Sequence, residues 1–135
     1  MRFLANLHQL SDWGLLALRL GVGMSFWVHG TSKRAMWKMA PSPQMPAGFL
    51  STLRLLSIVE PLGAAAAFAG FLMQPVAVGF VIIMLGAIRL KAVQMHRGFS
   101  ADGGWELDLV LLSAGLALVS LGAGAISLDR LLFGL

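Results

Sequence analysis

The chain has 135 residues, enough for one domain, and 58% of them are hydrophobic while only 12% are charged. This composition excludes an ordinary soluble domain and is typical of an integral membrane protein. Because the sequence contains no cysteine, the chain itself cannot carry a disulfide framework, a thiolate metal site or a thiol redox relay. The formal net charge of +4 does not indicate nucleic-acid binding, since the ten lysines and arginines form no separate basic domain.

The first eleven residues do not have the pattern of a cleaved signal peptide, because no sustained apolar core precedes a small-residue cleavage site. Their apolar side chains, Phe3, Leu4, Leu7 and Leu10, fit one face of a short helix lying at the membrane interface. The first membrane span is then predicted over residues 12–30, since about 20 apolar residues cross the hydrocarbon core.

Small residues follow one another at helical spacing in two of the predicted spans. Ala17, Gly21 and Ser25 line one face of the first span, and residues 64–67 of the second are four alanines. Such positions let membrane helices approach closely. The alternative is that glycine and alanine are simply common in membrane helices.

The connection over residues 31–51 contains three prolines, which predicts an irregular or interfacial segment capping one end of the bundle. The second and third spans, residues 52–73 and 75–96, nearly fuse into one apolar run. We expect the turn between them at Gln74-Pro75, because proline cannot continue the helical hydrogen bonding that precedes it.

The fourth span is predicted over residues 105–126, and an amphipathic tail follows it. Ser127 is a plausible N-cap of a helix that would lie along the outer interface. Its apolar positions at helical spacing are Leu128, Leu131, Leu132 and Leu135. The sequence therefore predicts an all-α, single-domain protein over residues 1–135: a membrane-embedded four-helix up-and-down bundle with short interfacial helices at both termini.

The basic residues predict how the spans are oriented. They gather in the first connection and in the segment joining the third and fourth spans, whereas the opposite side has only Arg2 and Arg130. The positive-inside rule then places both of those connections in the cytoplasm and both termini outside it. The four tryptophans fall near predicted span ends, as an interfacial aromatic belt would: Trp13, Trp27, Trp37 and Trp105.

In this arrangement most ionisable residues of the spans lie in the cytoplasmic half, and we predict a polar chamber there that is open to one side and has a binding role. Charged groups inside a membrane should face the bundle interior and be paired or hydrated. The candidate binding residues are Arg19, His29, Glu60, Arg89, His96, Glu106 and Asp108.

Glu60 and Arg19 are the deepest of these groups, and opposite charge at similar depth predicts that they pair. Pro61 leaves the carbonyl of Ser57 without its helical donor, which predicts a local bend beside Glu60. The alternative to a binding role is an ion pair that only fixes helix packing.

The residues do not favour a metal site, a haem site, a hydrolase or a nucleotide-driven pump. A bis-histidine haem or a metal site would require His29 and His96 to converge, and interfacial hydrogen bonding explains them better. We therefore predict no metal site, and read the eight scattered methionines as gap-filling side chains. The sequence contains no nucleophile-base-orienter pattern, phosphate loop or dinucleotide fingerprint.

Three stretches together resemble the DoxX family of small bacterial four-helix membrane proteins. They are "LRLGVGMSFWVHGTSK" (18–33), "VEPLGAAAAFAGFL" (59–72) and "HRGFSADGGWELDLVLLSAGLALVSLGAGAISLDRLL" (96–132), in the order that the family has them. The resemblance covers nearly the whole chain and implies the same fold in a bacterial inner membrane. The family is related to the small subunit of thiosulfate:quinone oxidoreductase, which implies a quinone-linked or complex-forming role.

The resemblance also implies site residues. The positions that match the family's polar residues, and would surround a head group, are Arg19, His29, Glu60, His96 and Glu106. The sequence departs from the family where Leu107-Asp108 replaces the usual aromatic-proline pair, which adds a carboxylate to the chamber. It also lacks the proline and arginine often found before Ser127.

Three functions remain open on the sequence. The first is a subunit of a quinone-linked oxidoreductase, with no covalently bound cofactor and a separate redox partner that carries the electrons. The second is a non-catalytic accessory or assembly subunit that docks a larger membrane complex. The third is a small-solute transporter, which would need access from both sides although the charges crowd one half.

Overall fold

The computed structural model describes residues 7–135 and is all-α. Its four main helices are α2 (Ser11–Ser32), α3 (Ala47–Ala69), α4 (Met73–Arg89) and α5 (Glu106–Leu121). Phe3 and Leu4, half of the predicted N-terminal apolar face, lie outside the described residues, and Leu7–Leu10 forms a short 3-10 helix, η1.

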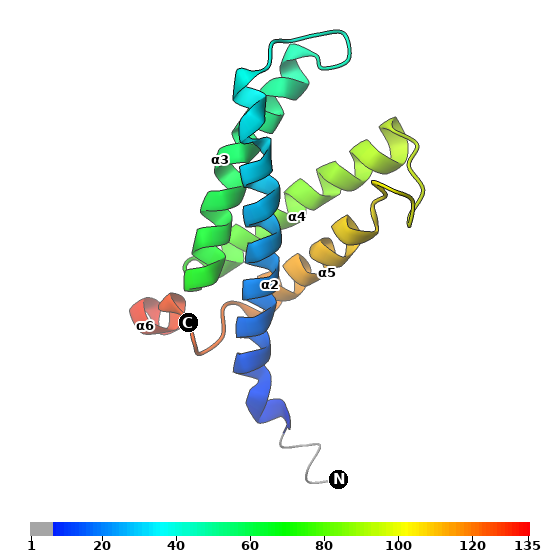
Figure 1. The fold of residues 1–135 in the computed structure, drawn as a ribbon. Coiled ribbons are helices and arrows are strands. Elements are labelled where there is room, and N and C mark those ends of the chain that lie inside the picture. The colour runs from blue at the N-terminus through cyan, green and yellow to red at the C-terminus, as the bar shows by residue number, and fades with distance from the viewer. Residues whose placement is uncertain (1–6) are drawn as a thin grey trace.

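The four helices pack as two antiparallel pairs rather than as one evenly packed bundle. α2 lies along α3, forming the first hairpin, and α4 lies along α5, forming the second. Figure 1 shows the two hairpins crossing near α6 (Leu128–Phe133) and spreading apart toward their connecting loops. The helical prediction is confirmed, and the even bundle becomes two hairpins joined at one end.

Aromatic and aliphatic side chains join the hairpins where they cross. Phe26 of α2 stacks on Phe80 of α4 with ring centroids 3.9 Å apart and planes 12° apart. Ala64 and Ala67 of α3 are fully buried in the same core. The alanines predicted to thin the second span therefore do allow close packing.

The close approach of α2 to α3 uses different small residues from those predicted on α2. Ala17 is exposed and a side chain at Gly21 would meet nothing, whereas a Cβ at Gly23 would lie 2.7 Å from the Phe68 ring. Gly30 likewise lies against Pro61. Within the described residues, α3 therefore packs on the stripe of α2 adjacent to the predicted small-residue face.

The turn between α3 and α4 lies at residues 70–72, not at Gln74-Pro75. Gly70 ends α3 in the left-handed conformation at φ 65°, where glycine has no steric penalty. Pro75 instead lies in the first turn of α4, where its missing N–H would have no helical partner anyway. Pro61 is inside α3, which continues through it as a helix.

Two helices are long and apolar enough to cross a membrane, Ala47–Ala69 and Met73–Gln94. In the best apolar window of each, only 28% and 17% of the residues are buried inside the protein. A core helix of a soluble protein would be mostly buried, whereas most of the residues in these two windows are not.

Candidate functional site

A cleft of about 550 Å³ opens between the two hairpins where they spread apart. Its apolar walls come from one face of α3 and one face of α4 and the helical turn that follows α4. The residues on these walls include Phe49, Leu53, Leu56, Ile82, Ile83 and Leu90. Its charged lining comes from the last turn of α2 and the residue after it, the middle of α3, the segment after α4 and the first turn of α5: His29, Lys33, Glu60, Lys91 and Asp108. A cavity of this size with a few convergent polar groups is typical of small-molecule sites.

Glu60 is held by Lys33, at the start of the 3-10 helix η2 (Lys33–Lys38). The Lys33 Nζ lies 2.5 Å from the Glu60 Oε2, and the Glu60 side chain is 2% exposed while that of Lys33 is 22% exposed. Lys33 Nζ also donates to the carbonyl of His29 at 3.3 Å. The absence of a side chain at Gly30 lets α2 approach Glu60 and Pro61 closely, which brings its last turn to the carboxylate.

The second hairpin carries a similar pair. Lys91 lies in a π-helical turn, η3 (Leu90–Gln94), and its Nζ is 2.7 Å from Oδ2 of Asp108 in the first turn of α5. That oxygen accepts no aligned hydrogen bond from the described residues, so the contact is one of charge and distance rather than of hydrogen-bond geometry. The Lys91 ammonium donates to the Gly104 carbonyl at 3.3 Å.

The predicted pair of Arg19 and Glu60 is wrong. Arg19 is 1% exposed and lies near the crossing of the hairpins, where its guanidinium donates to the carbonyls of Ala67 at 3.3 Å and Ile126 at 2.5 Å. In an antiparallel pair the residue numbers of facing positions have a nearly constant sum. Since Gly30 faces Glu60, Arg19 must face the end of α3, about 16 Å away along the helix.

Three more predicted residues lie outside the cleft lining. Arg89 is exposed at the end of α4, and Glu106 is exposed at the start of α5. His96 is exposed beyond η3 with φ 51°, so it does not share a helical face with Arg89 as the seven-residue spacing predicted. Of the seven predicted site residues, the cleft brings together His29, Glu60 and Asp108.

From the sequence, Lys33 and Lys91 are interpreted mainly as basic residues that orient the spans in the membrane, and not as candidate binding residues. The spacing held a signal for Lys33, which follows His29 by four residues and so shares its helical face. Lys91 and Gln94 are related by the same argument at a spacing of three. The sequence does not predict the π turn that places Lys91 beside Asp108. A shift from i→i+4 to i→i+5 hydrogen bonds over five residues leaves no clear periodicity in the sequence.

The opposite end of the molecule is closed by the C-terminal segment. The carboxylate of Asp129 accepts from the backbone N–H groups of Leu72 at 2.6 Å and Met73 at 2.8 Å, at the start of α4. Ser127 caps α6 as predicted, since its Oγ accepts from the N–H of Arg130 at 3.2 Å. Asp12 accepts from the N–H of Ala125 at 2.7 Å. These contacts tie the chain end to both hairpins.

Neither end assembles a metal centre from the described part of the chain: residues 7–135 contain no group of three His, Asp or Glu side chains close enough to hold an ion. Comparisons with protein-family models, with curated proteins and with solved structures gave no match. The geometry of the cleft is therefore the main basis for a functional proposal.

Proposed function

We propose that this chain is an integral membrane subunit of a quinone-linked oxidoreductase system and that the cleft between its hairpins binds the quinone. The observation that carries the proposal is the composition of the cleft, which combines apolar walls with two lysine-carboxylate pairs and His29. A quinone has a polar ring and an apolar tail, and these two surfaces match its two parts.

The proposal places all four main helices in the membrane. α3 and the continuous α4-η3 helix are each about 33 Å long or more, enough to cross a hydrocarbon core of about 30 Å. α2 carries exposed apolar side chains such as Leu20, Met24 and Val28, and α5 carries Val110 and Leu116. Lipid contact explains that exposure. The basic residues of the two loops orient the open end of the cleft toward the cytoplasm.

A redox partner is part of this proposal, because quinone chemistry needs a group that supplies or removes electrons. The resemblance to the DoxX family, whose relatives include a subunit of a quinone oxidoreductase, favours the same assignment. In this arrangement the cleft residues bind and orient the ring, and Glu60 and Asp108 are acceptors that can receive a proton near it.

The direct test is a binding titration of the purified protein in lipid nanodiscs with decylubiquinone, followed by quenching of tryptophan fluorescence. We expect saturable binding that is weakened about tenfold or more by Lys33→Gln, which removes the ammonium donor, and left unchanged by Lys38→Gln, which lies outside the cleft lining. Unsaturable partition into the lipid, equal in both variants and the parent, would contradict the proposal.

An accessory role is the alternative, and one observation favours it: each buried carboxylate already has a cation beside it, so the two pairs could serve packing alone. The native complex separates the two functions. Glu60→Gln should leave assembly intact and abolish turnover if the cleft binds quinone, whereas it should impair assembly if the pair is structural.

A further inference from the structure

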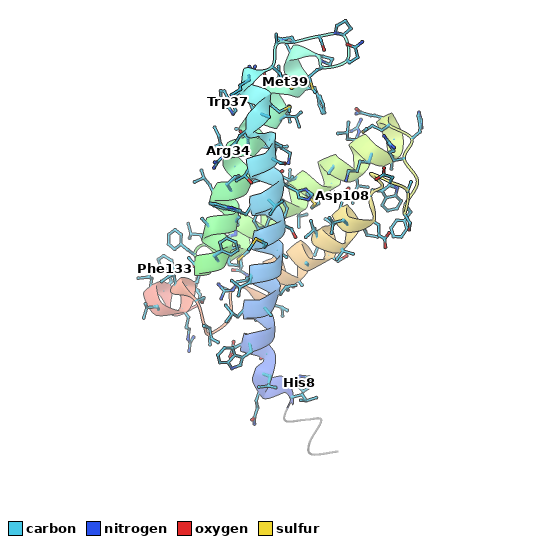
Figure 2. All side chains as sticks on the ribbon, viewed as in Figure 1. His8, Arg34, Trp37, Met39, Asp108 and Phe133 are labelled. Atoms are coloured by element: carbon cyan, nitrogen blue, oxygen red, sulfur yellow. The ribbon has the colours of Figure 1, made fainter. Side chains whose placement is uncertain are left out.

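The two ion pairs of the cleft are distributed one to each hairpin. Lys33 and Glu60 join α2 to α3, and Lys91 and Asp108 join η3 to α5. Among residues 7–135 neither pair crosses from one hairpin to the other, although all four side chains line the same cavity. In Figure 2, Asp108 marks the second hairpin, and Trp37 marks the loop end of the first. The cleft thus has matching charged groups on its two sides.

Each pair offers a ligand both kinds of hydrogen-bonding partner. A lysine ammonium has three N–H donors and no acceptor, while an ionised carboxylate only accepts. The side chains of Lys33 and Lys91 remain 22% and 28% exposed, so their donors are not all enclosed by the carboxylates. One pair can therefore donate to a carbonyl oxygen or accept from a hydroxyl group without changing its own partners.

We propose that the ligand is held at two points, with one polar oxygen on each side of its ring against one lysine-carboxylate pair, so that it bridges the hairpins. This inference rests on the proposed function and specifies its ligand as a para-quinone and the corresponding quinol, whose two oxygens lie on opposite sides of the ring. The quinone oxygens accept from Lys33 and Lys91, and the quinol hydroxyls donate to Glu60 and Asp108.

The apolar walls determine where the tail goes. Leu53 and Leu56 of α3 line the cavity together with Ile82 of α4 and Leu90 of η3, and Ile82 is 64% exposed. A tail attached to the bridging ring therefore leaves between α3 and α4 toward the surrounding lipid. This orders the ligand with its head at the two ion pairs and its tail between the two apolar helices.

The test removes each pair without leaving a lone charge, since replacing both partners by apolar groups is better tolerated than removing one. The variants are Lys33→Met with Glu60→Met, and Lys91→Met with Asp108→Leu. Lys38→Met, an exposed lysine outside the cleft lining, is the control. Thermal unfolding in nanodiscs verifies that each variant folds, and the probes are decylubiquinone and 2-decylphenol, which has one oxygen.

Two-point binding predicts that loss of either pair weakens decylubiquinone binding about tenfold or more, while 2-decylphenol responds to only one of the two pairs. If decylubiquinone binds saturably but responds to one pair only, two-point binding is wrong and the proposed function stands. If the parent protein binds no decylubiquinone saturably, both are wrong. If either paired variant fails to fold, the single changes Lys33→Gln and Lys91→Gln, which remove the ammonium donor but leave an amide that can contact the carboxylate, replace it in the same comparison.

Discussion

The guanidinium of Arg19 occupies the space that any side chain at Gly70 would fill. Gly70 is buried, ends α3 at φ 65°, and its carbonyl accepts from the N–H of Asp129 at 2.9 Å. Two features thus require glycine here, the left-handed backbone and the arginine packed on it. The same guanidinium donates to the carbonyls of Ala67 and Ile126, so Arg19 connects α2 to the end of α3 and to the C-terminal segment.

Gly70→Ala should destabilise the protein strongly. The left-handed conformation alone costs a residue with a Cβ about 1–2 kcal/mol, and displacement of Arg19 adds to that. Thermal unfolding in nanodiscs would measure the change. Gly79→Ala is the matched control, because a Cβ at Gly79 within α4 meets nothing, and we expect an unchanged or slightly higher midpoint.

Asp129→Ala should loosen the start of α4. The side chain is 6% exposed and its two oxygens accept from the N–H groups of Leu72 and Met73. Loss of these two hydrogen bonds should lower the free energy of unfolding by about 1–3 kcal/mol. Asp129→Asn keeps one acceptor oxygen, so its free energy of unfolding should lie between those of the parent protein and Asp129→Ala. Asp102→Ala, at an exposed loop position, should have no effect. Equal midpoints for the alanine variants at 129 and 102 would contradict this role.

Gly30→Ala should separate α2 from α3 beside the cleft. An added Cβ would overlap Pro61 and lie 2.8 Å from the Cβ of Glu60. Overpacking of this kind costs about 1–3 kcal/mol. Gly21→Ala, on the face of α2 that meets nothing, provides the comparison and should be tolerated. A lower unfolding midpoint for Gly21→Ala than for Gly30→Ala would contradict the packing of α2 on α3 described above.

Replacing Lys33 should destabilise the protein more than replacing its partner Glu60. Lys33→Met leaves a carboxylate that is 2% exposed without its cation, at a cost of about 1–3 kcal/mol, whereas Glu60→Gln leaves a lysine that can reach water. Lys33→Met should therefore lower the unfolding midpoint more than Glu60→Gln does. Lys38→Met controls for the loss of a basic residue from the same segment.

The orientation of the chain can be measured with introduced cysteines, because the sequence has none of its own. Cysteine at Gln44 or Ser100 lies in the loops at the open end of the cleft, and cysteine at Gly134 lies by α6. In spheroplasts, a membrane-impermeant maleimide should label position 134 and not 44 or 100, if the positive-inside rule holds. The reverse pattern would put the open end of the cleft outside.

Local patterns in the sequence determined which segments are helical, although the turn between α3 and α4 lies a few residues before the predicted one. Apolar runs of about 20 residues predicted the four helices, and Ser127 predicted the start of α6. The need to place Glu60 inside the protein also followed from the sequence, since an ionised group on an apolar helix must find a partner or water. These properties depend on residues a few positions apart.

Tertiary structure alone decided which cation meets Glu60. The register of α2 against α3 depends on which small residues of α2 allow α3 to approach closely. These residues are Gly23 and Gly30 rather than Gly21. That register places Lys33 beside Glu60 and leaves Arg19 near Ala67. The division into two hairpins, and with it the cleft, depends on the same contacts. Because helix packing joins positions tens of residues apart, and several registers satisfy the same local pattern, only the folded chain selects one.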